Sequence, residues 1–202
     1  TDKELQPLRY TYGGGALDKT MFTFDSDVLA SDNNFTTSLS NEQFSVFEVS
    51  KINAVSNAVF GYYNLSDGSL IEMGTNAAGN YEVSVSDGTT TLLRKTATVD
   101  TGKYHIASLR KTSKYIYFDY YDSTNDADLS VGNPVFIGAT SFEQDKFRIG
   151  CTQTTDGLIP PAAINTKYLD GDFQEVIIYD RKLTDGETAK VVDYLNKKYR
   201  IY

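Results

Sequence analysis

Three carboxylates lie close together near the end of the chain: Asp170, Asp172 and Glu175. Paired carboxylates hydrolyse glycosidic bonds, one acting as an acid and the other as a nucleophile or base. Successive side chains of a regular β-strand point to opposite faces of its sheet. On a strand without a bulge, Glu175 would therefore face away from Asp172. We expect these carboxylates to belong to a structural strand and not to a catalytic pair.

A single histidine, His105, limits two other kinds of chemistry. A Ser-His-Asp triad would have to use it. A zinc site needs several His or Cys ligands, and the chain has one of each. His105 lies mid-strand in an alternating run, and its same-face neighbours Ala107 and Leu109 are apolar. We therefore expect a structural role for His105 and no enzymatic activity, with a glycoside hydrolase or polysaccharide lyase as the alternative.

A tyrosine-rich hairpin offers a binding site instead. Its expected strands are 104–110 and 115–121, joined by a turn at 111–114. In this register Arg110 opposes Tyr115, and Tyr104 opposes Tyr121. The other face of the hairpin should belong to the core. We predict that six side chains on the first face bind a ligand: Tyr104, Arg110, Tyr115, Tyr117, Asp119 and Tyr121.

The composition of this face indicates a glycan as the ligand. Aromatic rings stack on the apolar faces of sugars, and neighbouring charged groups orient the sugar hydroxyls. The alternative is that these tyrosines pack beneath a loop or against a neighbouring subunit, because the surfaces of β proteins are often rich in tyrosine.

Acidic residues gather just after this hairpin. Oxygen ligands suit calcium, and the candidate ligands are Asp122, Asn125, Asp126 and Asp128. A second acidic group contains Asp25, Asp27 and Asp32. Neither group matches an EF-hand loop, and such clusters are usually solvated. No cofactor is required, and calcium is kept as a hypothesis.

Strands must position most of these residues. Short β-rich stretches recur between turn signals, which include five Asp-Gly pairs. The expected strands are 8–12, 20–24, 44–50, 58–63, 70–73, 81–86, 90–95, 104–110, 115–121, 135–138, 147–151 and 172–179. The clearest hairpin joins 81–86 to 90–93, with Tyr81, Val83 and Val85 on one face.

One helix is expected, at the end of the chain. Thr184 and Glu187 have the spacing of a capping box, and Val192, Leu195 and Tyr199 follow at helical spacing. We expect this helix to lie at the edge of a β-sandwich.

Composition sets limits on class and partners. The 202 residues fit one domain, 1–202, and 15 Tyr and 11 Phe with no Trp favour a β protein. A net charge of −8 argues against nucleic acid and anionic lipid. No apolar run approaches the roughly 20 residues of a membrane span, so we expect no membrane insertion. Because the chain starts at Thr1 without a signal pattern, we expect a mature or excised piece.

Several segments, in their order and spacing, resemble a known family. They are 102–110 with its return 115–119, then 147–150, 169–187 and 194–199. Together they resemble a laminin G-like domain of the concanavalin A-like lectin and glucanase superfamily, of bacterial or phage type. The resemblance covers roughly the last hundred residues. It implies an all-β, antiparallel jelly-roll sandwich with one short C-terminal helix. Glucanases of this superfamily use Glu-x-Asp-x-x-Glu, and Asp170 stands where the first Glu would be.

These observations lead to one functional prediction. The chain is expected to be a noncatalytic carbohydrate-recognition or adhesion module, extracellular, on a cell surface or on a virion. Its expected partner is a glycan or cell-surface polysaccharide. The alternative is a structural phage tail or capsid domain that assembles with other virion or surface-protein subunits.

Overall fold

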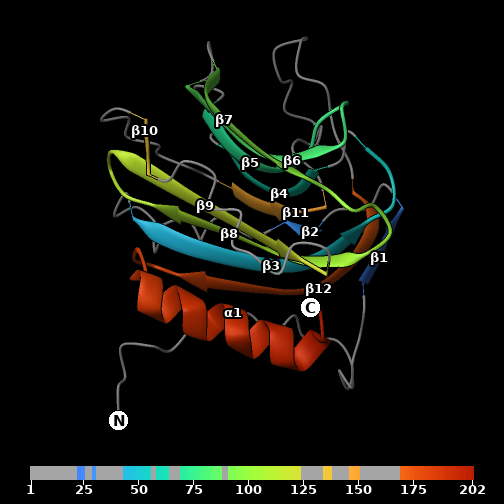
Figure 1. Cartoon of the computed structure of the whole chain (residues 1–202). Coiled ribbons are helices and arrows are strands. Elements are labelled where there is room, and N and C mark those ends of the chain that lie inside the picture. Colours follow the sequence, from blue (N-terminus) through green and yellow to red (C-terminus); the bar gives the residue numbers. More distant parts are fainter. Residues whose placement is uncertain are drawn as a thin grey trace.

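The described residues form a two-layered β-sandwich with a helix beneath it (Figure 1). A computed structural model describes residues 22–25, 29–30, 43–55, 58–63, 69–87, 91–123, 134–137, 146–150 and 169–202. The strands pair in antiparallel fashion within both sheets. The expected jelly-roll sandwich with one C-terminal helix is confirmed.

Each sheet combines strands that are distant in sequence. The first, sheet A, has the order β1-β12-β3-β8-β9-β10, and the second, sheet B, has the order β2-β11-β4-β5-β6-β7. The strands of sheet A are β1 (Phe22–Asp25), β3 (Phe44–Ile52), β8 (Tyr104–Lys111), β9 (Tyr115–Asp122), β10 (Val135–Phe136) and β12 (Asp170–Tyr179). Those of sheet B are β2 (Leu29–Ala30), β4 (Ala58–Tyr63), β5 (Ser69–Thr75), β6 (Asn80–Asp87), β7 (Thr91–Thr98) and β11 (Lys146–Ile149).

The expected strands agree well with these elements. Every expected strand within the described residues overlaps an observed one, whereas the expected strand at 8–12 lies outside them. The two-residue strand β2 was not expected, because it is too short for an alternating pattern to stand out.

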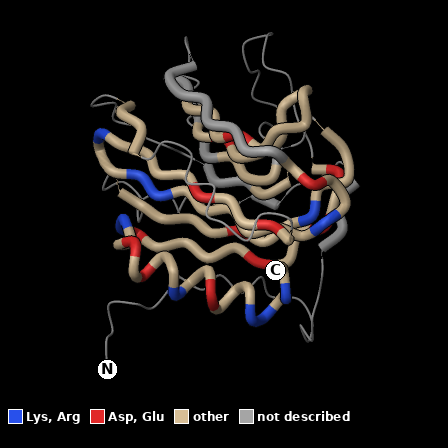
Figure 2. The backbone as a smooth tube through the Cα atoms, viewed as in Figure 1, with Lys and Arg blue, Asp and Glu red and all other residues tan. Residues whose placement is uncertain are grey.

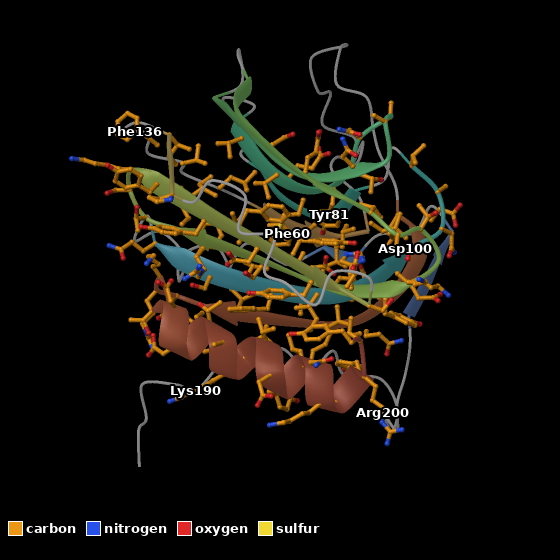
Figure 3. The ribbon with its side chains drawn as sticks, viewed as in Figure 1. Phe60, Tyr81, Asp100, Phe136, Lys190 and Arg200 are labelled. Carbon is orange, nitrogen blue, oxygen red and sulfur yellow. The ribbon has the colours of Figure 1, made fainter. Side chains whose placement is uncertain are left out.

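The inner faces of the two sheets enclose the main core. Tyr81, Val83 and Val85 are fully buried there, so the expected shared face of this strand is confirmed. Figure 3 shows Tyr81 and Phe60 between the two layers. Burying one large apolar side chain stabilises a fold by about 1.5–3 kcal/mol, so this layer supplies much of the driving force for folding.

The C-terminal helix α1 (Asp185–Tyr199) begins as expected. The Oγ1 atom of Thr184 accepts a hydrogen bond from the Glu187 amide at 3.3 Å, and the Glu187 carboxylate accepts one from the Thr184 amide at 2.8 Å. This reciprocal pair is the capping box.

The expected position of this helix at the sandwich edge is wrong. α1 lies against the outer face of sheet A (Figure 1). A second apolar cluster joins Val191, Val192 and Leu195 of the helix to Phe47 and Ile106 of the sheet. The sequence signal for this arrangement is the unbroken apolar run at 177–179, since a strand that is buried on both faces loses its alternation.

The described part of the chain contains no helix that is both long and apolar enough to cross a membrane.

Candidate functional site

The tyrosine-rich hairpin forms, but its register differs from the expected one. Arg110 pairs with Tyr117 instead of Tyr115, and Ser108 pairs with Asp119. The turn is tighter than expected, because the Thr112 amide donates to the Tyr115 carbonyl at 2.8 Å and leaves two residues between them. A shift of two residues leaves every side chain on its expected face, since strands repeat every two residues.

The central charged pair of this face is buried. Arg110 and Asp119 are 4% and 2% exposed. Nη2 of Arg110 donates to Oδ2 of Asp119 at 2.9 Å, and the Ser108 hydroxyl donates to the same oxygen at 3.1 Å. Nη1 of Arg110 donates to Oδ1 of Asp185 at 2.6 Å and so reaches the first turn of α1. These contacts fasten the hairpin to the helix.

The charge of this network is well compensated. Burial lowers the pKa of Arg110, but the hydrogen bond to Asp185 and the charge of Asp119 outweigh it, so the pKa rises above its usual value. The hydrogen bond from Arg110 lowers the pKa of Asp185. The centre of this face is therefore held against the first turn of α1.

The turn end of the same face remains accessible. Tyr115 is 38% exposed, and Phe136 on the neighbouring strand β10 is 64% exposed. Their rings meet edge to face, with centroids 5.6 Å apart. Tyr117 is half-buried beside them. We call the set Lys114, Tyr115, Tyr117, Phe136 and Lys182 the turn-end strip.

Three members of this strip were not among the predicted ligand residues: Lys114, which belongs to the expected turn, Phe136 and Lys182. The last two come from other segments of the chain. Phe136 stands opposite Tyr115 in the pairing of β10 with β9. Lys182 follows β12, and its Nζ lies 4.2 Å from the Tyr117 ring centroid. Both positions depend on contacts between segments far apart in the chain, so no local pattern could have indicated them.

Tyr104 and Tyr121, the remaining predicted ligand residues, lie at the opposite end of the hairpin. The hydroxyl of Tyr104 donates to Asp172 at 3.2 Å and accepts from the amide of Gln174 at 3.0 Å. Tyr121 stacks on Tyr202 with ring centroids 6.2 Å apart. The face thus contains two separate groups of tyrosines, and ligand binding by either group remains a prediction.

Asp172 and Glu175 lie on the same face, contrary to our expectation. The pairing of β12 with β3 shifts between Phe173 and Glu175, so Gln174 is an extra residue and β12 is bulged. Both carboxylates point outward from sheet A and both are engaged. Asp172 pairs with Lys51, whereas Glu175 accepts from Lys198 at 2.9 Å and from the Tyr199 hydroxyl at 3.0 Å.

His105 is fully buried between the sheets, in accordance with a structural role. Its Nε2 lies 3.1 Å from the Ser50 hydroxyl and 3.1 Å from Oε1 of Glu48. A nucleophilic triad needs the serine and the acid on opposite nitrogens of the imidazole. Here both contact the same nitrogen and no surface is exposed, so this trio cannot attack a substrate.

The calcium hypothesis is not tested. Asp122 is buried opposite His105 on the inner face of sheet A, and Asn125, Asp126 and Asp128 lie outside the described residues, as do Asp27 and Asp32. Among the residues that the structure describes, no group of three or more His, Cys, Asp or Glu side chains is arranged to hold a metal ion.

Sequence comparison gives no relatives: no family model matches the chain, and no curated protein matches it. Solved structures do match. Mouse laminin α1 domains LG4-5 give a TM-score of 0.61 at 11% identity, over 87% of this chain and 46% of that chain. The native heptameric SAP-like pentraxin of Limulus polyphemus gives 0.54 at 12% identity, over 75% and 70%.

A third similar structure is the CBM40 module of the Ruminococcus gnavus IT-sialidase bound to α2,3-sialyllactose. It gives a TM-score of 0.53 at 17% identity, over 77% of this chain and 85% of that chain. Two further matching structures are longer chains, and this chain covers only 32% and 26% of their lengths. The fold of the chain is therefore the concanavalin A-like jelly roll that the sequence motifs indicated.

Proposed function

We propose that this concanavalin A-like domain, which spans residues 1–202, is a noncatalytic carbohydrate-recognition module, and that the turn-end strip is its ligand site. The observation that carries the proposal is the exposed pair of rings, Tyr115 and Phe136, beside the half-buried Tyr117. Exposed rings on a rigid strand edge provide a platform for the apolar face of a sugar. The sialyllactose complex of the R. gnavus module, which shares this fold, supports the choice of a glycan.

The charged residues of the originally predicted site act indirectly in this proposal. Arg110 and Asp119 are buried and hold the hairpin against the helix, so they position the strip without contacting the ligand. A module of this kind works outside the cell or at a cell or virion surface, where glycans are presented.

A glycan array tests the proposal. Wild-type protein is applied with calcium and with a chelator, next to the Tyr115→Ala and Phe136→Ala variants. Tyr194→Ala is the matched control, because Tyr194 is 47% exposed on α1, away from the strip. We expect each strip variant to weaken binding about fivefold or more, as truncation of a central aromatic contact usually does.

The possible results distinguish a failure of the proposed function from a failure of the proposed site. If folded wild-type protein binds nothing across a broad array, the glycan proposal loses its support. Binding that persists in both strip variants would move the site elsewhere. An assembly role is the competing explanation for exposed rings, and a trimer or larger species that dissociates after Phe136→Ala would favour it in light-scattering measurements.

A further inference from the structure

The Tyr117 ring already carries a cation on its face. Nζ of Lys182 lies 4.2 Å from the ring centroid, and the guanidinium carbon of Arg110 lies 5.2 Å from it. Arg110 is buried, whereas Lys182 is half-buried. Lys182 is therefore the cation that an incoming ligand meets, and a sugar that stacks there has to displace its ammonium group.

Basic residues gather at this end of the sandwich, with the exposed Asp180 and Asp185 next to the β12–α1 junction. Figure 2 shows Lys and Arg of the β8–β9 hairpin and of the β12–α1 junction at the same end of the sandwich. Arg110 is paired with Asp119 and Asp185, and Arg181 with Glu187. Within the described part of the chain, Lys114 and Lys182 form no salt bridge and flank the tyrosines. A chain with a net charge of −8 would otherwise repel an anionic ligand.

We propose that Lys182 makes the turn-end strip select acidic glycans over neutral ones; this inference rests on the proposed function. A neutral sugar that covers Tyr117 removes the cation–π contact and leaves the displaced ammonium in water. A carboxylate or sulfate on the glycan gives that ammonium a charge-assisted hydrogen bond in exchange. Lys182 thus sets specificity, while the rings of Tyr115 and Phe136 supply contact area.

The test uses sialic acid and uronic acid glycans, each paired with its carboxyl-reduced counterpart. We expect wild-type protein to bind the acidic member of a pair about two- to fivefold more tightly, which is the range of exposed cation–π contacts and ion pairs. Lys182→Met removes the charge and keeps the apolar stem. The Lys182→Met variant should abolish the preference. Its binding of the reduced member should stay the same or improve, because no ammonium group has to be displaced from the Tyr117 ring.

Lys190→Met is the matched control, since Lys190 is exposed on α1 far from Phe136 (Figure 3). It should keep the wild-type preference. Equal binding of both members of each pair, while Tyr115→Ala still weakens binding, would overturn the inference and leave the proposed function standing. An equal loss of both members in Lys182→Met would overturn it as well. If no glycan binds to folded wild-type protein, the proposed function fails together with the inference.

Discussion

The hydroxyl of Tyr81 donates a hydrogen bond of 2.6 Å to Oε1 of Glu48, and this bond joins the two sheets through the middle of the sandwich. Both residues are fully buried. Burial and the neighbouring Glu48 raise the pKa of Tyr81 well above its usual value, so the hydroxyl keeps its proton and remains a donor. A polar group inside an apolar layer is costly without such a partner.

Removal of this donor should destabilise the protein. We expect Tyr81→Phe to lower the free energy of unfolding by about 1–3 kcal/mol, because the buried Glu48 carboxylate loses its shorter hydrogen bond and keeps, among the described residues, only the contact with His105. Urea denaturation followed by fluorescence measures this change, and Tyr115→Phe at the exposed turn end is the control. A midpoint for Tyr81→Phe equal to that of wild type would contradict the prediction.

Gly171 tolerates no side chain. A Cβ atom at this position would lie 1.9 Å from the carbonyl oxygen of Lys51 on the paired strand β3. We expect Gly171→Ala to cost about 1–3 kcal/mol or more of stability, because backbone has to move to make room. Gly186→Ala in α1 is the control, because nothing lies within 4 Å of the position that its Cβ would take. We expect this variant to gain up to about 1 kcal/mol of stability, since alanine favours the helix more than glycine does. Thermal melts compare the two.

Glu187 should contribute to the loss of folding stability in acid. The hydrogen bond from Arg181, with further donors from Thr184, lowers the pKa of Glu187 from 4.5 to about 2. A carboxylate whose pKa is lower in the folded chain stabilises the fold above its ordinary pKa. This contribution is therefore present above pH 4.5 and is lost as the pH falls towards about 2.

The acid dependence of the Glu187→Gln variant checks this assignment. Its free energy of unfolding should fall less steeply than that of wild type between these two pH values, with a difference within about 1 kcal/mol because the ion pair is partly exposed. Identical slopes would show that Glu187 has no part in the acid response.

Arg110 binds two carboxylates that should differ greatly in their effect on stability. The side chain of Asp119 is 3% exposed and that of Asp185 is 90% exposed. Arg110→Met leaves Asp119 buried without its cation and should cost about 3–5 kcal/mol. Asp185→Asn should cost less than about 1 kcal/mol, because solvent screens an exposed ion pair. Chemical denaturation of the two variants gives the comparison, and equal losses would argue against the buried pair.

Local sequence patterns were sufficient for several elements. Alternation placed Tyr81, Val83 and Val85 on a buried face, and the spacing of Thr184 and Glu187 identified the start of α1. The faces of the β8–β9 hairpin were also assigned correctly although its register was not. These features depend on residues that are neighbours in the chain, where the strand and helix periods and the capping hydrogen bonds determine the outcome.

Only the tertiary structure decided which surface is open. The helix covers the middle of the outer face of sheet A, because Val191 and Leu195 need an apolar partner and Phe47 and Ile106 provide one. The bulge at Gln174 turned Glu175 to the side of Asp172. Phe136 and Lys182 reached the hairpin tyrosines from distant segments. By itself, the sequence determined the strands, the capped helix and the jelly-roll class. Three features arise from packing between segments far apart in the sequence: the coverage of sheet A by the helix, the bulge in β12 and the composition of the turn-end strip. Burial between these segments offsets the conformational entropy that is lost when the chain is ordered.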